Sequence, residues 1–396
     1  MAPLDIAMPS QALNLNPARA TLSALCASLV GIGLARFAYT PLLPALIGAG
    51  WFAPSAAAYL GAANLAGYLA GALLAPALAA RMGAVRMLRL MMALATLAFF
   101  ACAAPLSFAW YFVWRFAAGA AGGVLMALAA PTVLPHVPLE RRGVAGGVIF
   151  TGVGLGIAAS GTLVPWLLGW GPVQTWCGLG VIALVLTLFA WGGWPGAAPP
   201  RAARAAATAP GSRAVQAVYV AYALNALGLV PHMIFLVDFV ARGLGQDLAA
   251  GGRYWIVFGV GAMLGPVLTG ALADRIGFPA AVRVAFVVQA GAIGVLALVT
   301  SPVWLVLSSA VVGAFVPGIV PLVLGRVTEL VAPTEAARTA AWSRATAAFA
   351  LGQAAAGYGM SFVYTRTGDY AALFALGAAA LVLALAIDLT ATRPRA

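Results

Sequence analysis

The sequence predicts an all-α membrane protein with twelve transmembrane helices arranged as two six-helix bundles. Of its 396 residues, 64% are hydrophobic and only 8% are charged, whereas a soluble protein carries about 25% charged residues. So few charges cannot cover a surface that faces water. The chain is therefore predicted to lie in a lipid bilayer and to be surrounded mainly by lipid.

Twelve apolar segments are long enough to cross that bilayer. A spanning helix needs about 20 mostly apolar residues, and spans joined by very short loops must run antiparallel. The predicted spans are residues 20–47, 55–80, 85–105, 107–135, 142–168, 172–194, 214–241, 250–273, 279–300, 303–331, 336–364 and 370–391.

The distribution of arginines indicates how the spans are oriented. All 21 basic residues are arginine, and they give a net charge of +12. Short cytoplasmic loops carry an excess of positive charge. With both termini in the cytoplasm, only three arginines fall in outer loops, namely Arg242, Arg253 and Arg366. The excess of arginine therefore reflects membrane topology, and nucleic acid is not an expected partner.

A segment rich in Pro, Ala and Gly divides the chain. Residues 195–213 include Arg201, Arg204 and Arg213 and are too polar to span a membrane. We predict a cytoplasmic linker here, between an N-terminal bundle at residues 1–194 and a C-terminal bundle at residues 214–396.

The two halves repeat each other in sequence. A shift of 194 residues brings glycines onto glycines and arginine onto arginine. The matched pairs are Gly67 with Gly261, Gly71 with Gly265, Arg81 with Arg275, Gly83 with Gly277 and Gly119 with Gly313. Such a duplication relates the halves by an axis along the membrane normal and predicts a site between them, near the midplane.

The stretch Gly31–Pro44 contains the most informative residue, Arg36, inside the first predicted span. A charge at that depth costs roughly 2.5–3.5 kcal/mol by insertion scales, so it faces a cavity, a partner or a ligand rather than lipid. Glycines before it and prolines after it let the helix deform around the charge. Arg36 is a candidate for binding an anionic group; the structural alternative is a buried ion pair or a bond to backbone carbonyls.

Four further polar residues within spans are candidates to line the same cavity. Tyr39 lies three residues after Arg36, on nearly the same helical face. Asn64 and Gln353 are uncharged amides that either contact a ligand or form hydrogen bonds between helices. His232 falls beside Arg36 when the first spans of the two halves are aligned.

Three ionisable residues are candidates for proton coupling: Asp238, Glu329 and Arg115. A buried carboxylate can take up a proton when it loses a charged partner. Asp238 also lies four residues before Arg242, and Glu329 lies three residues after Arg326. Both carboxylates can therefore form ion pairs along a helix instead.

The sequence contains no pattern for catalysis or for a bound metal. Cys26, Cys102 and Cys177 all lie in apolar segments without metal-ligand spacing. There is also no phosphate-binding loop of the Walker type. We therefore expect neither an enzyme nor a cofactor.

Two loops at matching places in the halves resemble the paired signature of the major facilitator superfamily. They read Pro76-Ala-Leu-Ala-Ala-Arg-Met-Gly83 and Gly270-Ala-Leu-Ala-Asp-Arg-Ile-Gly277. The resemblance implies the major facilitator fold and a gating role for these loops, carried by Arg81, Gly83, Asp274, Arg275 and Gly277. In the family the aspartate helps to lock the cytoplasmic helix ends in one state; Asp274 can do so, whereas Ala80 cannot.

Within the superfamily, the chain looks like the YbfB/YjiJ group. The likeness rests on Ala35–Pro44, Asn64–Tyr68, Pro231-His232 with Asp238 and Arg242, and Gly352-Gln353. It implies a secondary active transporter of a small organic solute, coupled to protons and working by alternating access, as a monomer in a bacterial inner membrane. Arg36 favours an anionic solute. The alternatives are proton-driven efflux of drugs or metabolites, which needs an acidic residue in the cavity, and a membrane sensor that does not transport.

Overall fold

The computed structural model describes residues 16–138, 141–195, 213–332 and 334–391. These residues form helices, turns and bends without a β-strand. Eleven helices within them are long and apolar enough to cross a membrane. Most of the predicted linker at residues 195–213 lies outside the described residues.

The N-terminal half contains six long helical stretches, the first of them in three pieces. The elements are α1 (Pro17–Ser28), η1 (Leu29–Leu34), α2 (Tyr39–Gly48), α3 (Pro54–Met82), α4 (Ala84–Cys102), α5 (Phe108–Val133), η2 (Leu134–His136), α6 (Arg142–Leu168) and α7 (Pro172–Trp191).

The C-terminal half follows the same order, and its first stretch is also broken. The elements are α8 (Arg213–Val230), η4 (Pro231–Phe235), α9 (Leu236–Asp238), η5 (Phe239–Gly243), α10 (Leu248–Ile276), α11 (Phe278–Gly294), η6 (Val295–Ala297), α12 (Pro302–Leu330), α13 (Glu335–Thr367) and α14 (Tyr370–Ala391).

Each of the twelve predicted segments coincides with a helical stretch, but α13 is not among the eleven candidate spans. This helix carries charged and small polar side chains, including Arg338, Arg344 and Gln353. Its length suffices for a span, whereas its composition is less apolar than that of the others. Twelve membrane crossings therefore remain a prediction.

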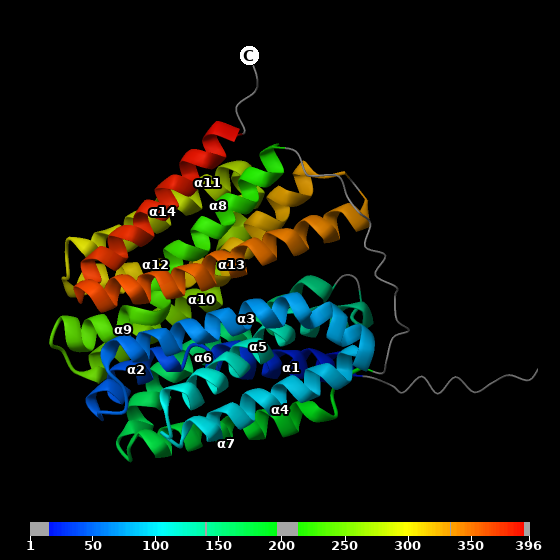
Figure 1. The fold of residues 1–396 in the computed structure, drawn as a ribbon. Coiled ribbons are helices and arrows are strands. Elements are labelled where there is room, and N and C mark those ends of the chain that lie inside the picture. The colour runs from blue at the N-terminus through cyan, green and yellow to red at the C-terminus, as the bar shows by residue number, and fades with distance from the viewer. Residues whose placement is uncertain (1–15, 139–140, 196–212, 333, 392–396) are drawn as a thin grey trace, which may run out of the picture.

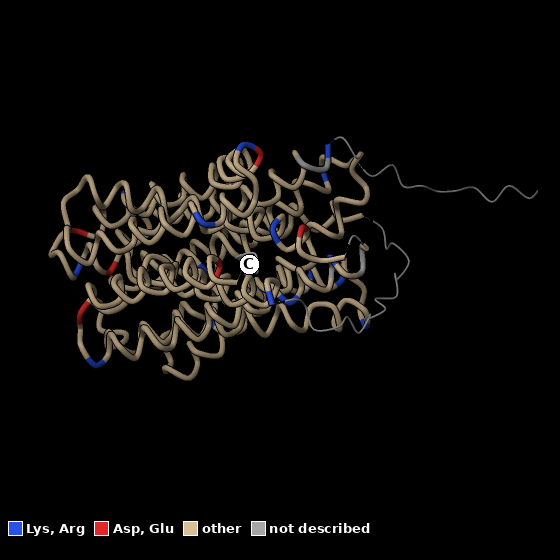
Figure 2. Tube along the Cα trace, turned by 90° about the horizontal axis from the view of Figure 1, so that it is seen from above, with Lys and Arg blue, Asp and Glu red and all other residues tan. Residues whose placement is uncertain are grey.

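The helices form two groups that lie side by side. Figure 1 shows α1–α7 in one group and α8–α14 in the other, with α3 and α13 running next to each other at the boundary. The two groups pack along α6 with α10, along α3 with α13, and through α2 with α9. In Figure 2 many charged residues lie towards the two ends of the helices, and a smaller number lie along the central length.

The predicted repeat is confirmed by how the matched glycines pack. A Cβ on Gly71 of α3 would collide with the Ala120 carbonyl of α5, and a Cβ on Gly265 of α10 would collide with the Ala314 carbonyl of α12. The matched loops also agree, because Gly83 and Gly277 end α3 and α10 with φ of 81° and 79°. The two halves therefore share one packing register.

The first stretch of each half is distorted, and in the N-terminal half the distortion falls where the sequence predicts a deformed helix. In the N-terminal half, the π-helical turn η1 follows α1 and contains Gly31 and Gly33, and a non-helical turn at 35–38 precedes α2. In the C-terminal half, Pro231 opens the π-helical turn η4. Proline, glycine and π-turns are the usual causes of such breaks. Both breaks face the boundary between the halves, where the candidate site lies.

Candidate functional site

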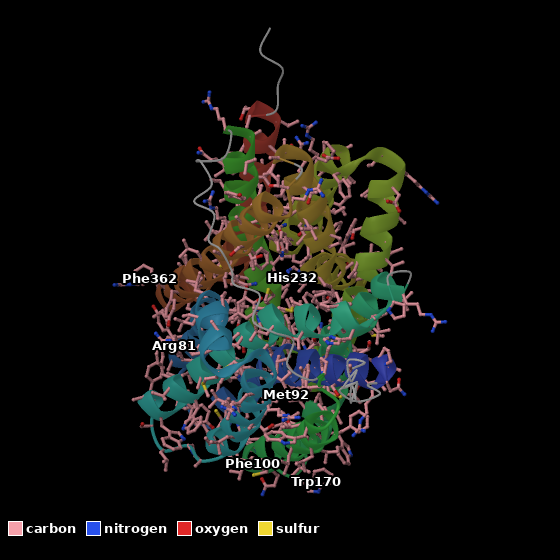
Figure 3. All side chains as sticks on the ribbon, turned by 90° about the vertical axis from the view of Figure 1, so that its right-hand side faces the viewer. Arg81, Met92, Phe100, Trp170, His232 and Phe362 are labelled. Carbon is pink, nitrogen blue, oxygen red and sulfur yellow. The ribbon has the colours of Figure 1, made fainter. Side chains whose placement is uncertain are left out.

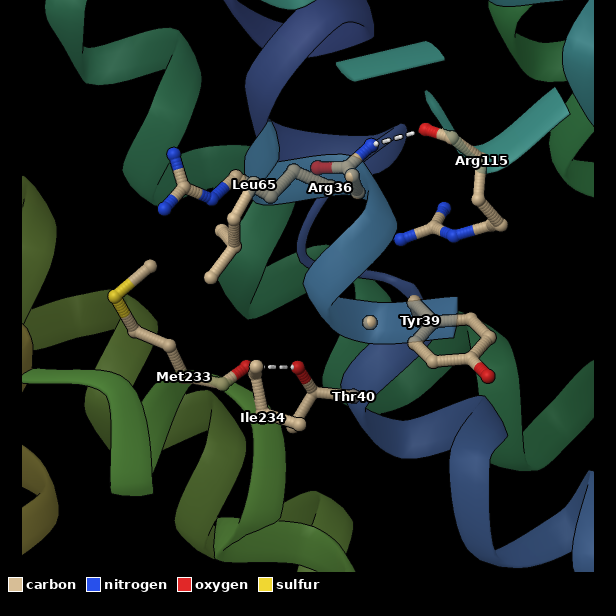
Figure 4. A pocket seen from close by; sticks show the side chains of 9 residues that line it. Arg36, Tyr39, Thr40, Leu65, Arg115, Met233 and Ile234 are labelled. Atoms are coloured by element: carbon tan, nitrogen blue, oxygen red, sulfur yellow. Dashed lines mark hydrogen bonds between the residues drawn. The ribbon is translucent and has the colours of Figure 1, made fainter. Parts of the chain in front are cut away.

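A small cavity lies at the boundary between the halves, next to the broken part of the first stretch. Its volume is about 10 Å³, which is room for about one water molecule. Seven lining residues come from the N-terminal half and two from the C-terminal half: Arg36, Tyr39, Thr40, Gly61, Asn64, Leu65, Arg115, Met233 and Ile234. Figure 4 shows these side chains from close by. Three of the five predicted substrate-binding residues therefore line one cavity.

Arg36 follows the π-helical turn η1 and has no described carboxylate as a partner for its charge. Its guanidinium carbon lies 5.2 Å from the ring centres of both Phe37 and Tyr68. The Nε and Nη2 atoms are buried without a hydrogen-bond partner, and no described carboxylate forms an ion pair with them. Aromatic faces attract a cation but do not satisfy its N–H groups. Of the structural alternatives for Arg36, neither the ion pair nor the carbonyl bond is present for these two atoms.

Arg115 instead holds the broken helix in place. Its Nη1 donates a hydrogen bond to the Ala35 carbonyl at 2.7 Å, and its guanidinium lies 4.3 Å from the centre of the Tyr39 ring. The Asn64 amide nitrogen donates to the Arg115 carbonyl at 3.2 Å. The Tyr39 hydroxyl donates to the Ala57 carbonyl at 2.8 Å. This chain of contacts ties α3 and α5 to the backbone next to Arg36.

The cavity is strongly electropositive. Two arginines, Arg36 and Arg115, line it, and its lining contains neither aspartate nor glutamate. Arginine does not lose its proton in proteins, so both groups stay charged. Charges buried at membrane depth usually find an opposite charge or serve a ligand. The arrangement is suited to binding an anion.

The two halves touch directly beside the cavity. The Thr40 hydroxyl donates to the Met233 carbonyl at 2.5 Å, as Figure 4 shows. The Met233 sulfur in turn accepts a weak hydrogen bond from Gln353 Nε2 at 3.4 Å, and Gln353 Oε1 is buried without a partner. Gln353 therefore lies behind Met233 and does not line the cavity in this conformation.

His232 does not line the cavity either. Its side chain is fully buried, and its Nε2 lies 2.7 Å from the Ser308 hydroxyl. Its ring packs against Phe258 and Phe374 of the same half. Figure 3 shows it near the centre of the molecule. His232 lies in the π-helical turn η4, and its side chain turns into its own bundle. It does not line the cavity in this conformation, and its role in binding stays a prediction.

Asp238 belongs to a polar cluster inside the C-terminal half. It is 0% exposed, and its Oδ2 accepts a hydrogen bond from Tyr370 at 2.5 Å. Its Oδ1 lies 3.5 Å from Arg242 Nη1, which confirms the ion pair that the spacing allows. Arg242 also donates to the Tyr364 hydroxyl, which lies 2.9 Å from that of Tyr370. The cluster joins α9, η5, α13 and α14.

Glu329 lies near the end of α12. It pairs with Arg326 at 3.2 Å, which confirms the predicted i,i+3 contact. The Glu329 side chain is 43% exposed, so it is not the buried carboxylate that a proton site at this position requires.

The two signature loops lie at the ends of α3 and α10. Arg81, Asp274 and Arg275 are exposed, and none of them is in an ion pair with the residues that the structure describes. Figure 3 shows Arg81 at the periphery. Among the described residues, Asp274 therefore makes no ion pair across helix ends, and the lock that the resemblance implies stays a prediction.

Sequence reasoning missed several residues of the site. Tyr68 stacks on Arg36, and Met233 and Ile234 close the cavity from the other half. Tyr68 carried a detectable signal, since it follows Asn64 by four residues and therefore shares its helical face. Met233 and Ile234 are ordinary apolar residues, and only the contact between the halves identifies them.

The structure thus consists of two similar helical bundles that meet around a small cavity lined by two arginines. The family described as "Uncharacterised MFS-type transporter YbfB" matches residues 28–389. The chain belongs to this family, and its members are transporters of the major facilitator superfamily.

The fold is also that of a solved transporter structure. The chain is similar to a point mutant of the nucleoside transporter NupG, with a TM-score of 0.79 over 94% of this chain and 100% of that chain. The sequence identity is 14%, so the likeness concerns the fold. No curated protein matches the chain.

Proposed function

We propose that the protein is a secondary active transporter of a small organic anion, and that Arg36 binds the anionic group. The observation that carries the proposal is the pair of buried, unpartnered donors of Arg36 in a cavity without a carboxylate. A cation exporter needs an acidic residue in that place. The proposal includes twelve spans, cytoplasmic termini, a monomer and the bacterial inner membrane.

Alternating access is supported by an uneven boundary between the halves. On α6, a Cβ on Gly154 or Gly161 would collide with α10, whereas Gly146 and Gly147 near the start of α6 have open space around them. The halves are therefore in close contact over only part of their length. Small residues at such a contact allow helices to approach closely, and the halves can rock about the cavity.

Proton coupling is assigned to Asp238. This carboxylate is buried between helices, yet Arg242, its charged partner, is 30% exposed in its side chain. A proton on Asp238 would cancel the attraction to Arg242 and leave the hydrogen bond with Tyr370 as the remaining link. Such an event changes how the first stretch of the C-terminal half is held against α13 and α14.

The test uses proteoliposomes with a trapped pH-sensitive dye. Pooled organic acids and then pooled cationic amphiphiles are added to the wild type, to Arg36→Ala and to empty liposomes. We expect proton movement with the acids in the wild type and none in Arg36→Ala. Proton movement with the cations that persists in Arg36→Ala would contradict the proposal and favour an exporter.

A further inference from the structure

The unpaired atoms of Arg36 select the geometry of the anion. Nε and Nη2 lie on the same edge of the guanidinium plane and point their N–H bonds in parallel. Both are buried without a partner, so this edge is free for a side-on contact. Two parallel N–H donors match the two oxygens of a carboxylate and give a bidentate, charge-assisted pair.

The orientation of Asn64 adds a second requirement. Because the Arg115 carbonyl can only accept, the Asn64 nitrogen must face it, and the hydrogen bond at 3.2 Å fixes the amide in that orientation. Asn64 is 1% exposed, and its Oδ1 is left without a donor. A buried acceptor that lacks a partner is energetically unfavourable. The cavity of about 10 Å³ holds about one water molecule, so a larger ligand enters when the halves move apart. Such a ligand completes the site by bringing a hydrogen to this oxygen.

The donor is a hydroxyl rather than an ammonium group. Arg36 and Arg115 both line the cavity and repel a second cation. The rest of the lining is apolar, from Leu65, Met233 and Ile234. A Cβ on Gly61 would lie 3.3 Å from Ile234, so the space between the halves is narrow. The remainder of the ligand is therefore short and apolar.

We infer that the ligand is a small hydroxycarboxylate, with its carboxylate on the Nε–Nη2 edge of Arg36 and its hydroxyl donating to Asn64 Oδ1. This inference rests on the proposed function and names the substrate class of the same site. In this arrangement the N-terminal half binds the polar groups of the ligand. Met233 and Ile234 of the C-terminal half restrict the length of its carbon chain.

The experiment measures apparent affinity on the purified full-length protein by the shift of its thermal unfolding midpoint. The probes are lactate, propionate, 2-fluoropropionate, lactamide and alanine. Lactate is expected to bind about tenfold more tightly than propionate or 2-fluoropropionate, which lack the donor hydrogen. Lactamide and alanine are expected to give no shift, because one lacks the carboxylate and the other carries an ammonium group.

Variants separate the two contacts. Arg36→Lys keeps the charge but loses the paired donors, and lactate affinity should fall by about 10- to 100-fold. Asn64→Ala should bind lactate and propionate equally. Arg326→Lys, an arginine of α12 outside the cavity, is the matched control and should bind lactate as the wild type does. The comparison of lactate with 2-fluoropropionate needs no variant, so it holds even if Asn64→Ala does not fold.

The outcomes distinguish this inference from the proposed function. Equal binding of lactate, propionate and 2-fluoropropionate, abolished in Arg36→Ala, would overturn the hydroxyl contact and leave an anion site. Binding of lactate that is unchanged in Arg36→Lys would overturn the bidentate contact. A shift with alanine as large as that with lactate would overturn the preference for a hydroxyl over an ammonium group. A shift with lactamide as large as that with lactate would overturn both the inference and the anion site.

Discussion

The two regions around Arg36 and Asp238 both belong to the distorted first stretch of their halves but treat their charges in opposite ways. Each lies at a break in the first helical stretch of its half. The donors Nε and Nη2 of Arg36 have no partner, whereas Asp238 contacts both Tyr370 and Arg242. Both halves therefore have a break in their first stretch but place different charged residues along it. An unpartnered charge is available to a ligand, and a partnered one can hold the helices until its proton state changes.

The sharpest way to test this contrast is to remove the charge of Asp238. In Asp238→Asn the hydrogen bond from Tyr370 can persist, but Arg242 loses its countercharge. We expect substrate-driven proton movement to fall by at least about tenfold, while exchange of labelled substrate across the membrane continues. The measurement is a trapped pH dye beside a counterflow assay in the same proteoliposomes.

Asp388→Asn is the matched control, because Asp388 is another buried carboxylate of the C-terminal half, 2.7 Å from Arg283. It should keep proton movement. Loss of coupling in both variants would show that the effect is not specific to the Asp238 cluster.

A second comparison concerns the shared packing of the halves. Gly71→Ala and Gly265→Ala introduce a methyl group against the matched carbonyls of Ala120 and Ala314. Overpacking of this kind costs typically about 1–3 kcal/mol, and we expect similar losses of thermal stability in the two halves. Gly146→Ala, which faces open space, should leave the unfolding midpoint unchanged. A loss in only one half would show that the repeat has diverged in packing as well as in chemistry.

The smallest effect is expected at Glu329. Its pair with Arg326 is partly exposed, and such pairs contribute about 0–1 kcal/mol. Glu329→Gln should therefore retain coupled transport within about twofold. If Glu329→Gln lost proton movement while Asp238→Asn kept it, the proton-coupling residue would be Glu329 of α12 and not Asp238 of the first C-terminal stretch.

Much of the fold could be predicted because membrane spans depend on composition and length. The position of Arg36, the break beside it and the glycine repeat are all visible in the sequence. The composition of α13 shows the limit, since a helix packed against both its own bundle and α3 needs less apolar surface than one that faces lipid.

The candidate site could be predicted only in part, because contacts between helices depend on how side chains rotate. Alignment of the halves places His232 beside Arg36, but it does not predict the turn of the His232 ring towards Ser308. The bond from Arg115 to the Ala35 carbonyl joins residues 80 positions apart. No local sequence pattern predicts this hydrogen bond. Because of it, Arg115 supports the backbone of the site, while the Nε–Nη2 edge of Arg36 remains available to a ligand.

The central claim, that Arg36 is the anion-binding group, is tested most directly by ligand-dependent thermal stabilisation. A ligand that binds the folded state raises the unfolding midpoint. Purified wild type, Arg36→Ala and the control Arg326→Ala are heated with and without a saturating pool of small organic acids. We expect the acids to stabilise the wild type and the control but not Arg36→Ala. Equal stabilisation of all three proteins would contradict it.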